Sequence, residues 1–274
     1  MPSINTNAAA QVALQNMNAI GERLTLTQNR VSTGLKVQGA KDNAAVWAVA
    51  QNQRADMKAY EAVSHSLNRA TSIADVSIAA GEQISDLVTQ LKQKATAAAD
   101  PGGTLETRTA YNNESQALLQ SIAGFAANAT FDGQNILDGS STTPLQFLAN
   151  ADASSTIDLN RQDFTLAGLG LNPAPDLTTV AGATAALTAV TAALGTVNAG
   201  LAELGAEATR IDNHTVFVSK LMDSLEVGVG NLVDADMAKE SARLQALQVQ
   251  QQLSVQSLSI ANQAPQMILS LFQN

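Results

Sequence analysis

The residues of this sequence that could support catalysis are few, and they are not grouped. The two histidines, His65 and His214, stand in no H-E-x-x-H motif, so both are interpreted as exposed helix residues. Glu82 and Asp86 lie one helical turn apart, which on an amphipathic helix is typical of a solvated face rather than a catalytic acid pair. The Gly-Leu-Gly sequence at 168–170 lacks the third glycine of a dinucleotide-binding loop, and without cysteine there is no thiol chemistry. We therefore predict that the protein is not an enzyme and holds no cofactor or metal.

The composition favours long, thin helices over a thick globular core. Of the 274 residues, 45% are hydrophobic but only 3% are aromatic. The net charge of −9 leaves no basic surface that could neutralise phosphates, so nucleic acid and anionic membranes are not expected as partners. The sequence has neither a run of roughly 18 apolar residues nor a basic segment followed by an apolar one. It therefore predicts no membrane span and no secretory signal peptide.

Charged side chains are missing from both ends of the chain. Residues 1–21 and 244–274 contain no Asp, Glu, Lys, Arg or His. Frayed polar termini are one interpretation of this pattern. Disordered tails, however, are normally rich in charge and poor in aliphatic residues, and these ends are the reverse. The pattern favours burial of both ends.

Apolar residues recur at alternating steps of three and four through most of the chain, which predicts long helices packed along seams. Capping candidates such as Thr104 and Asp236, and glycines such as Gly34, delimit these helices. The expected helices cover about residues 7–34, 44–99, 104–128, 187–232 and from 237 onward. The third is expected to place Tyr111, Leu118, Ile122 and Phe125 on one face.

The periodicity changes in the middle of the chain. Asp132-Gly133 and Asp138-Gly139 are turn pairs, and short alternating runs follow them, which predicts two or three short hairpins. The predicted fold class is mainly α, with long antiparallel helical rods and coiled coil from both halves of the chain and a small β-hairpin-rich middle region.

The last helix carries aliphatic residues on two opposed faces. Leu253 and Ile260 lie on one face, and Leu247 and Leu258 lie on another. A helix that is apolar on several faces needs neighbours on several sides, and one partner helix from the same chain cannot supply them all. We therefore expect further copies of the protein to cover the rest.

Six segments of the sequence resemble those of bacterial flagellins in order and spacing. They are INTN at 4–7, RVSTGL at 30–35, AKDNAA at 40–45, FDGQNILDG at 131–139, the acidic turn from Asp234 to Asp236 followed by Glu240, and ANQ at 261–263 with the residues after it. The chain is identified as similar to a short, alphaproteobacterial-like flagellin. The resemblance covers about residues 1–140 and 185–274.

The resemblance implies a division of the chain into three regions. Residues 1–43 and 234–274 would form a terminal helical domain, the inner tube of a filament. Residues 44–130 and 181–233 would form a helical rod domain, the outer layer, and 131–180 a short hairpin or variable region. The implied function is that of a structural subunit of the extracellular flagellar filament for swimming motility, exported by the flagellar type III system.

The implied partners are other flagellin copies, hook-associated and cap proteins, and an export chaperone on the C-terminal helix. The expected assembly interface consists of positions on the two terminal helices and the turns beside them: Ile4, Leu14, Met17, Leu24, Arg30, Val31, Leu35, Leu247, Leu253, Leu258, Ile260, Met267, Ile268, Leu271 and Phe272. No nucleic acid or membrane is expected.

The sequence also departs from the family pattern. Asn43 and Val46-Trp47 replace the usual Asp and Gly-Leu, and Gln90 stands where the stretch recognised by vertebrate innate receptors normally carries Arg. We therefore expect weak receptor recognition.

Two other functions are compatible with parts of the sequence. A hook-filament junction protein would share the end motifs but form few copies. A soluble extracellular binding module or secreted effector would also be acidic and free of cysteine, but it would have no reason for uncharged ends.

Overall fold

The computed structural model describes the backbone of residues 6–272 and the side chains of residues 6–263. It contains five helices, α1 (Ala8–Thr33), α2 (Ala44–Ala98), α3 (Leu105–Asn128), α4 (Val180–Val233) and α5 (Met237–Phe272). Four short strands, β1 (Thr130–Phe131), β2 (Gln134–Asn135), β3 (Leu145–Leu148) and β4 (Thr156–Leu159), lie between α3 and α4. The predicted fold class is confirmed. The chain divides into two compact units, unit 1 (residues 1–55 and 224–274) and unit 2 (56–223).

The helices begin at side chains that cap their first turns. Asn7 accepts a hydrogen bond from the Ala10 amide, and Asn43 accepts one from the Val46 amide. Thr104 caps α3 through the Thr107 amide, and Asp236 caps α5 through the Lys239 amide at 3.1 Å. Gly34 ends α1 with a φ of 73°, a left-handed conformation that glycine adopts without strain.

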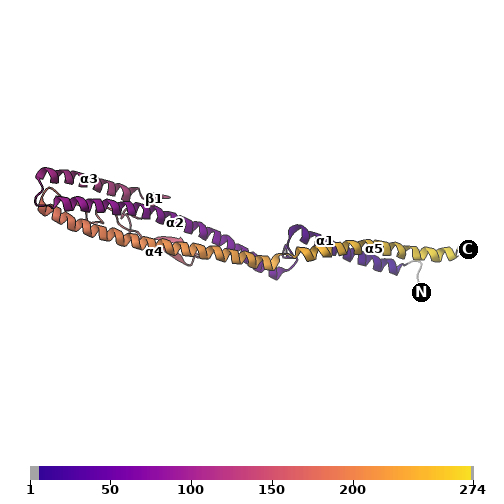
Figure 1. The fold of residues 1–274 in the computed structure, drawn as a ribbon. Coiled ribbons are helices and arrows are strands. Elements are labelled where there is room, and N and C mark those ends of the chain that lie inside the picture. The colour runs from indigo at the N-terminus through magenta and orange to yellow at the C-terminus, as the bar shows by residue number, and fades with distance from the viewer. Residues whose placement is uncertain (1–5, 273–274) are drawn as a thin grey trace. The chain divides into compact units, whose positions relative to one another are not determined.

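In unit 2, α2, α3 and α4 lie side by side (Figure 1) around a shared core. On α2 the residues that follow the predicted alternating steps of three and four between 63 and 95 are all buried: Val63, Leu67, Ala70, Ala74, Ser77, Gly81, Ile84, Val88, Leu91 and Ala95. On α4 every second member of the corresponding series is buried: Val190, Val197, Leu204, Ile211 and Val218. Leu201 of α4 approaches Gly81 of α2, and Ala183 of α4 packs near Ala95 and Ala98 of α2. The two helices are therefore antiparallel.

Two details of the prediction were wrong. On α3, Phe125 is 40% exposed, and the buried face instead passes through Ser115, Leu119, Ile122 and Ala126. The steps of three and four between these residues place them on one stripe that Phe125 does not share. His65 is exposed as predicted, but His214 is half-buried, and its Nε2 lies 2.7 Å from the carbonyl oxygen of Ala149.

The middle region folds as two antiparallel hairpins, β1–β2 and β3–β4. The turn of the first is Asp132-Gly133, as predicted, and both residues have positive φ. In the second, Leu145 pairs with Leu159 and Phe147 with Ile157. Phe147, Ile157 and Leu159 are buried in the core of unit 2, so this hairpin is packed against the helices.

Phe164, which follows the second hairpin, occupies a notch between α2 and α4. A Cβ at Gly200 would lie 2.8 Å from Phe164 Cε1, and one at Gly81 would lie 3.1 Å from Phe164 Cε2. The ring is fully buried. The absence of a side chain at these two glycines therefore leaves the space that the ring fills. The sequence did not predict this contact.

Gly200→Ala is expected to lower the free energy of unfolding of unit 2 by about 1–3 kcal/mol, because the added methyl group overlaps the Phe164 ring. Gly195→Ala is the matched control, since a Cβ at 195 has nothing within 4 Å and alanine favours the helix by up to about 1 kcal/mol. Denaturant unfolding followed by circular dichroism measures both. An equal change in the free energy of unfolding for the two variants would contradict the proposed overlap with the Phe164 ring.

Glu207 is a buried carboxylate on the seam side of α4, which the sequence analysis also missed. Its oxygens accept hydrogen bonds from the backbone amide (2.9 Å) and side-chain amide (2.6 Å) of Asn160, the residue after β4. Burial raises the pKa of Glu207 above 4.5, and the neighbouring charge of Glu203 raises it further, while the Asn160 amide and Arg210 act in the opposite direction.

This raised pKa predicts a pH dependence of stability. The folded state binds the proton of Glu207 more tightly than the unfolded state does, so its contribution is complete below the unfolded pKa and is lost as pH rises through the folded pKa. The stability of the wild type relative to Glu207→Gln should therefore fall as the pH rises above the ordinary pKa of a glutamate, about 4.3. Chemical denaturation of both proteins at a series of pH values below and above this point measures the difference. A stability difference between the two proteins that does not change with pH would contradict the prediction.

One described helix, α4, is long and apolar enough to cross a membrane by length and composition alone. An 18-residue window of α4 has a mean hydropathy of 1.6, and 28% of the window is buried. Val190, Val197 and Leu204 of this helix are fully buried in the core of unit 2. Packing inside the unit thus covers part of the apolar surface of α4.

Candidate assembly site

Unit 1 is built around the two terminal helices. α1 and α5 lie along one another (Figure 1), and they are antiparallel because the Asn7 side chain donates to the Ala261 carbonyl while Arg30 pairs with Glu240. Leu24, Thr27 and Leu247 are buried between them. The sequence places small or apolar residues at these inner positions, so the pair closes along a narrow seam.

The other faces of this pair leave large apolar side chains uncovered. On α5 the exposed fractions are 60% for Leu253 and 63% for Ile260. Others that are also exposed are Val12, Leu14, Leu26, Val249 and Val255. Six of these seven residues, all but Leu26, lie within the segments that contain no charged residue. A concentration of exposed aliphatic side chains marks an interaction surface.

The expected interface residues fall into four groups. Leu24 and Leu247 are buried within the α1–α5 pair, and Met17, Arg30, Val31, Leu35 and Leu258 are half-buried. Leu14, Leu253 and Ile260 are exposed. Ile4 and the side chains of Met267, Ile268, Leu271 and Phe272 lie outside the described residues. The structure therefore brings part of the set together inside one chain and leaves three members facing outward.

Sequence reasoning missed four of the exposed aliphatic residues: Val12, Leu26, Val249 and Val255. Val249 lies four residues before Leu253, so the same helical spacing that selected Leu253 could have selected it. Val12, Leu26 and Val255 do not follow the predicted seams, and only the placement of the partner helix shows that they are uncovered.

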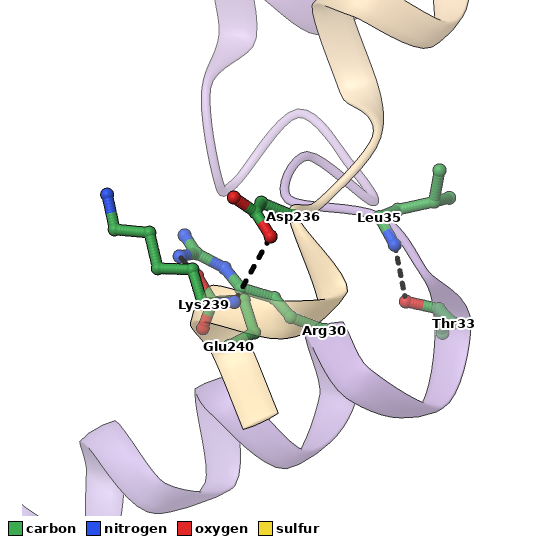
Figure 2. Close-up of polar contacts among 6 residues, drawn as sticks. All are labelled: Arg30, Thr33, Leu35, Asp236, Lys239 and Glu240. Carbon is green, nitrogen blue, oxygen red and sulfur yellow. Dashed lines mark hydrogen bonds and ion pairs between the residues drawn. The ribbon is translucent and has the colours of Figure 1, made fainter. Parts of the chain in front are cut away.

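A polar turn closes the end of the pair where α1 stops and α5 starts. Leu35 forms an isolated bridge with Asp234, the Ala235 amide donates to the Gly34 carbonyl at 2.7 Å, and the Lys36 amide donates to the Val233 carbonyl at 2.7 Å. Figure 2 shows Arg30 beside Glu240 and the Asp236 carboxylate accepting from the Lys239 amide. These contacts explain why this segment combines acidic residues with the arginine of α1.

The ion pair in this turn is the main electrostatic feature of unit 1. Arg30 Nη1 lies 3.3 Å from Glu240 Oε1, and the two side chains are 24% and 10% exposed. Arg30 Nε and Glu240 Oε2 are buried without a hydrogen-bond partner. A hollow of about 490 Å³ adjoins them and is also lined by Lys36, Asp42 and Arg243. Because acidic and basic groups are mixed along the hollow, it has no strong preference for an ion of either sign.

An antiparallel helix pair with uncharged ends and exposed aliphatic side chains, closed by a polar turn, is typical of helical structural proteins that present an interaction surface. Comparison with known proteins identifies the family. Residues 4–142 match the bacterial flagellin N-terminal helical region and residues 187–272 match the C-terminal helical region. The chain belongs to the bacterial flagellin family.

Relatives along the full length support this assignment. The chain is 48% identical over 271 residues to flagellin FljK of Caulobacter vibrioides, which covers 99% of this chain and 98% of the relative. It is 39% identical over 288 residues to a flagellin of Brucella melitensis, which covers 100% of both chains. As a flagellin it is a structural subunit of the flagellar filament, and because these full-length relatives are flagellins, the hook-filament junction alternative is not favoured.

Solved structures show the same fold. The crystal structure of Bacillus cereus flagellin matches with a TM-score of 0.50 and 22% identity, covering 54% of this chain and 85% of that one. A putative flagellar hook-associated protein from Vibrio parahaemolyticus matches with a TM-score of 0.59 and 13% identity, covering 70% of this chain and 100% of that one. At these identities the likeness concerns the fold alone.

Proposed function

We propose that this flagellin polymerises through its α1–α5 pair, whose uncovered aliphatic side chains are covered by neighbouring copies in the inner layer of the filament. The observation that carries the proposal is the exposure of Leu253 and Ile260 in a segment that contains no charge. Removing such side chains from water contributes about 25 cal/mol per Å² of buried apolar area. The hydrophobic effect is thus available to drive assembly once neighbours are present.

In the same proposal, residues 1–43 and 234–274 form the inner tube, 44–130 and 181–233 form an outer helical layer, and 131–180 face outward. The interface comprises the exposed and half-buried members of the expected set and the terminal positions Ile4, Met267, Ile268, Leu271 and Phe272. The protein performs no catalysis; turnover of any substrate by the purified chain, independent of assembly, would contradict this.

Seeded polymerisation tests this function. Purified monomer mixed with fragments of its own filaments should elongate them, as seen by electron microscopy of negatively stained samples. Failure to elongate across a range of salt concentrations and pH values would refute the proposal.

Further partners follow from membership of the family. We expect export by the flagellar type III system, with a chaperone bound to the C-terminal helix, and contacts with hook-associated and cap proteins at the filament ends. Truncation of residues 244–274 should abolish chaperone co-purification and leave unit 2 folded. Co-purification of the truncated chain at wild-type levels would place the chaperone elsewhere.

Weak recognition by vertebrate innate receptors is expected because Gln90 replaces the usual arginine, and Gln90 is exposed on α2. A receptor reporter assay should give a weaker response to this flagellin than to an enteric flagellin, and Gln90→Arg should raise it. A wild-type response equal to that of the enteric protein would contradict the expectation.

A further inference from the structure

A groove runs between α1 and α5 on a side of the pair that differs from the exposed ridge of α5. It has a volume of about 270 Å³ and is lined by small or uncharged residues, among them Ala9, Ala13, Ser254, Ser257 and Ala261. Cavities of about 150 Å³ lined by apolar residues can hold a benzene-sized group, so this groove has room for branched aliphatic side chains. Its walls carry no charge.

The ridge consists of Val249, Leu253 and Ile260, which are 55%, 60% and 63% exposed. At about 100° per residue, these positions cluster within about 40° on α5, whereas the groove residues Ser254, Ser257 and Ala261 are rotated from the ridge by roughly 60–120°. One copy of the chain therefore cannot place its own ridge in its own groove.

Most of the ridge matches the groove in length as well as in chemistry. The part from Leu253 to Ile260 spans seven residue steps, as does the groove wall from Ser254 to Ala261, so at 1.5 Å per residue each extends over about 10 Å of helix. Val249 lies about one further helical turn before Leu253. Both lie in the uncharged segments, so neither would desolvate an ion when they meet.

We propose that the ridge of one copy, formed by Val249, Leu253 and Ile260, docks in the α1–α5 groove of the next copy. The two surfaces are different patches, so the contact is heterologous, and a heterologous contact that does not close into a ring produces an open helical polymer. The inference rests on the proposed function and adds which face of one subunit meets which face of the next.

The absence of native cysteine permits a direct test by cross-linking. Ala13→Cys and Ile260→Cys chains, one of them labelled with ¹⁵N, are mixed in equal amounts and polymerised on wild-type seeds. Each chain then carries a single cysteine, so every disulfide joins two chains. After mild oxidation, mass spectrometry distinguishes disulfides between the two variants from disulfides between two copies of the same variant. Mixed dimers of Ala13→Cys with Ile260→Cys should exceed those of the control mixture of Ala13→Cys with Gln251→Cys by at least about tenfold, because α carbons more than about 7 Å apart cannot be bridged.

A second variant tests the groove without cysteine. Ala13→Leu places a larger side chain in the groove of the monomer and is expected to reduce seeded elongation at least about tenfold, whereas Thr142→Leu, which places the same side chain at an exposed loop position outside the groove and the ridge, should elongate normally. Normal growth of Ala13→Leu, or mixed disulfides no more abundant than in the control, would overturn the proposed contact while leaving polymerisation established. Failure of the wild-type chain itself to elongate would instead refute the proposed function. The assay contains only this chain. If the groove binds a different partner, Ala13→Leu should therefore elongate normally, and the proposed contact between copies is overturned.

Discussion

Leu253→Lys is expected to abolish elongation of filaments while leaving the helical content of the monomer unchanged. Leu253 is 60% exposed in the single chain, so a lysine there meets water and retains a favourable helix propensity. In a filament the same ammonium group would be enclosed among helices that contain no Asp or Glu from 1 to 21 or from 244 to 274. It would have no ion-pair partner.

The expected magnitude follows from the cost of a buried, unpaired charge, about 3 kcal/mol or more. That cost corresponds to a critical concentration raised at least ~100-fold. Sedimentation of seeded reactions measures the critical concentration, and circular dichroism of the monomer measures helicity. Ile260→Lys, at 63% exposure, should behave in the same way.

Two matched controls distinguish the effect of the added charge on elongation from the effect of the substituted position. Leu253→Met keeps an apolar side chain at the same site and should leave elongation nearly unchanged. Thr142→Lys adds the same charge to an exposed loop position of the middle region and should also be tolerated. Normal filaments from Leu253→Lys would show that this face stays in water after assembly.

Arg30→Met is expected to destabilise the polar turn of unit 1 by about 2–3 kcal/mol. Removing one member of a buried ion pair leaves the other without compensation, at a cost of about 3–5 kcal/mol for full burial. Glu240 is only 10% exposed, and its Oε2 is already without a partner, whereas Arg30 is 24% exposed, so we expect a value below that range.

Hydrogen exchange measures this loss locally. The amides of Lys36 and Ala235, which bond to the Val233 and Gly34 carbonyls, should exchange about 30- to 160-fold faster in Arg30→Met. The double variant Arg30→Met/Glu240→Met should recover most of the protection, since it removes both charges. Lys58→Met, which breaks an exposed pair with Glu61, is the control and should cost less than about 1 kcal/mol. A double variant as labile as the single one would show that the ion pair is not the cause.

Much of the helical architecture could be predicted from the sequence. Steps of three and four between apolar residues fix the face that a helix buries, and the predicted seam of α2 between 63 and 95 is buried at every position. Caps such as Thr104 and Asp236 act over three residues, so their role is also local. These features depend on neighbours in the chain, which is why they could be inferred without tertiary contacts.

Other features depend on residues far apart in the chain. The fit of Phe164 between Gly81 and Gly200, and the burial of Glu207 against Asn160, arise from the positions of separate elements. The sequence around Gly81, Gly200 or Glu207 does not show that a ring packs against the glycines or that the glutamate is buried. For the same reason the predicted face of α3 included Phe125, although the packing chose Leu119 and Ala126.

The sequence by itself determined that the ends of this flagellin are uncharged and form amphipathic helices, because charge and periodicity are properties of the chain alone. Only the tertiary structure decided which of their aliphatic residues remain uncovered. Leu247 and Leu253 belong to the same helix and both read as apolar interface positions. The placement of α1 buries Leu247 and leaves Leu253 in water, because a single partner helix can cover only one side of α5.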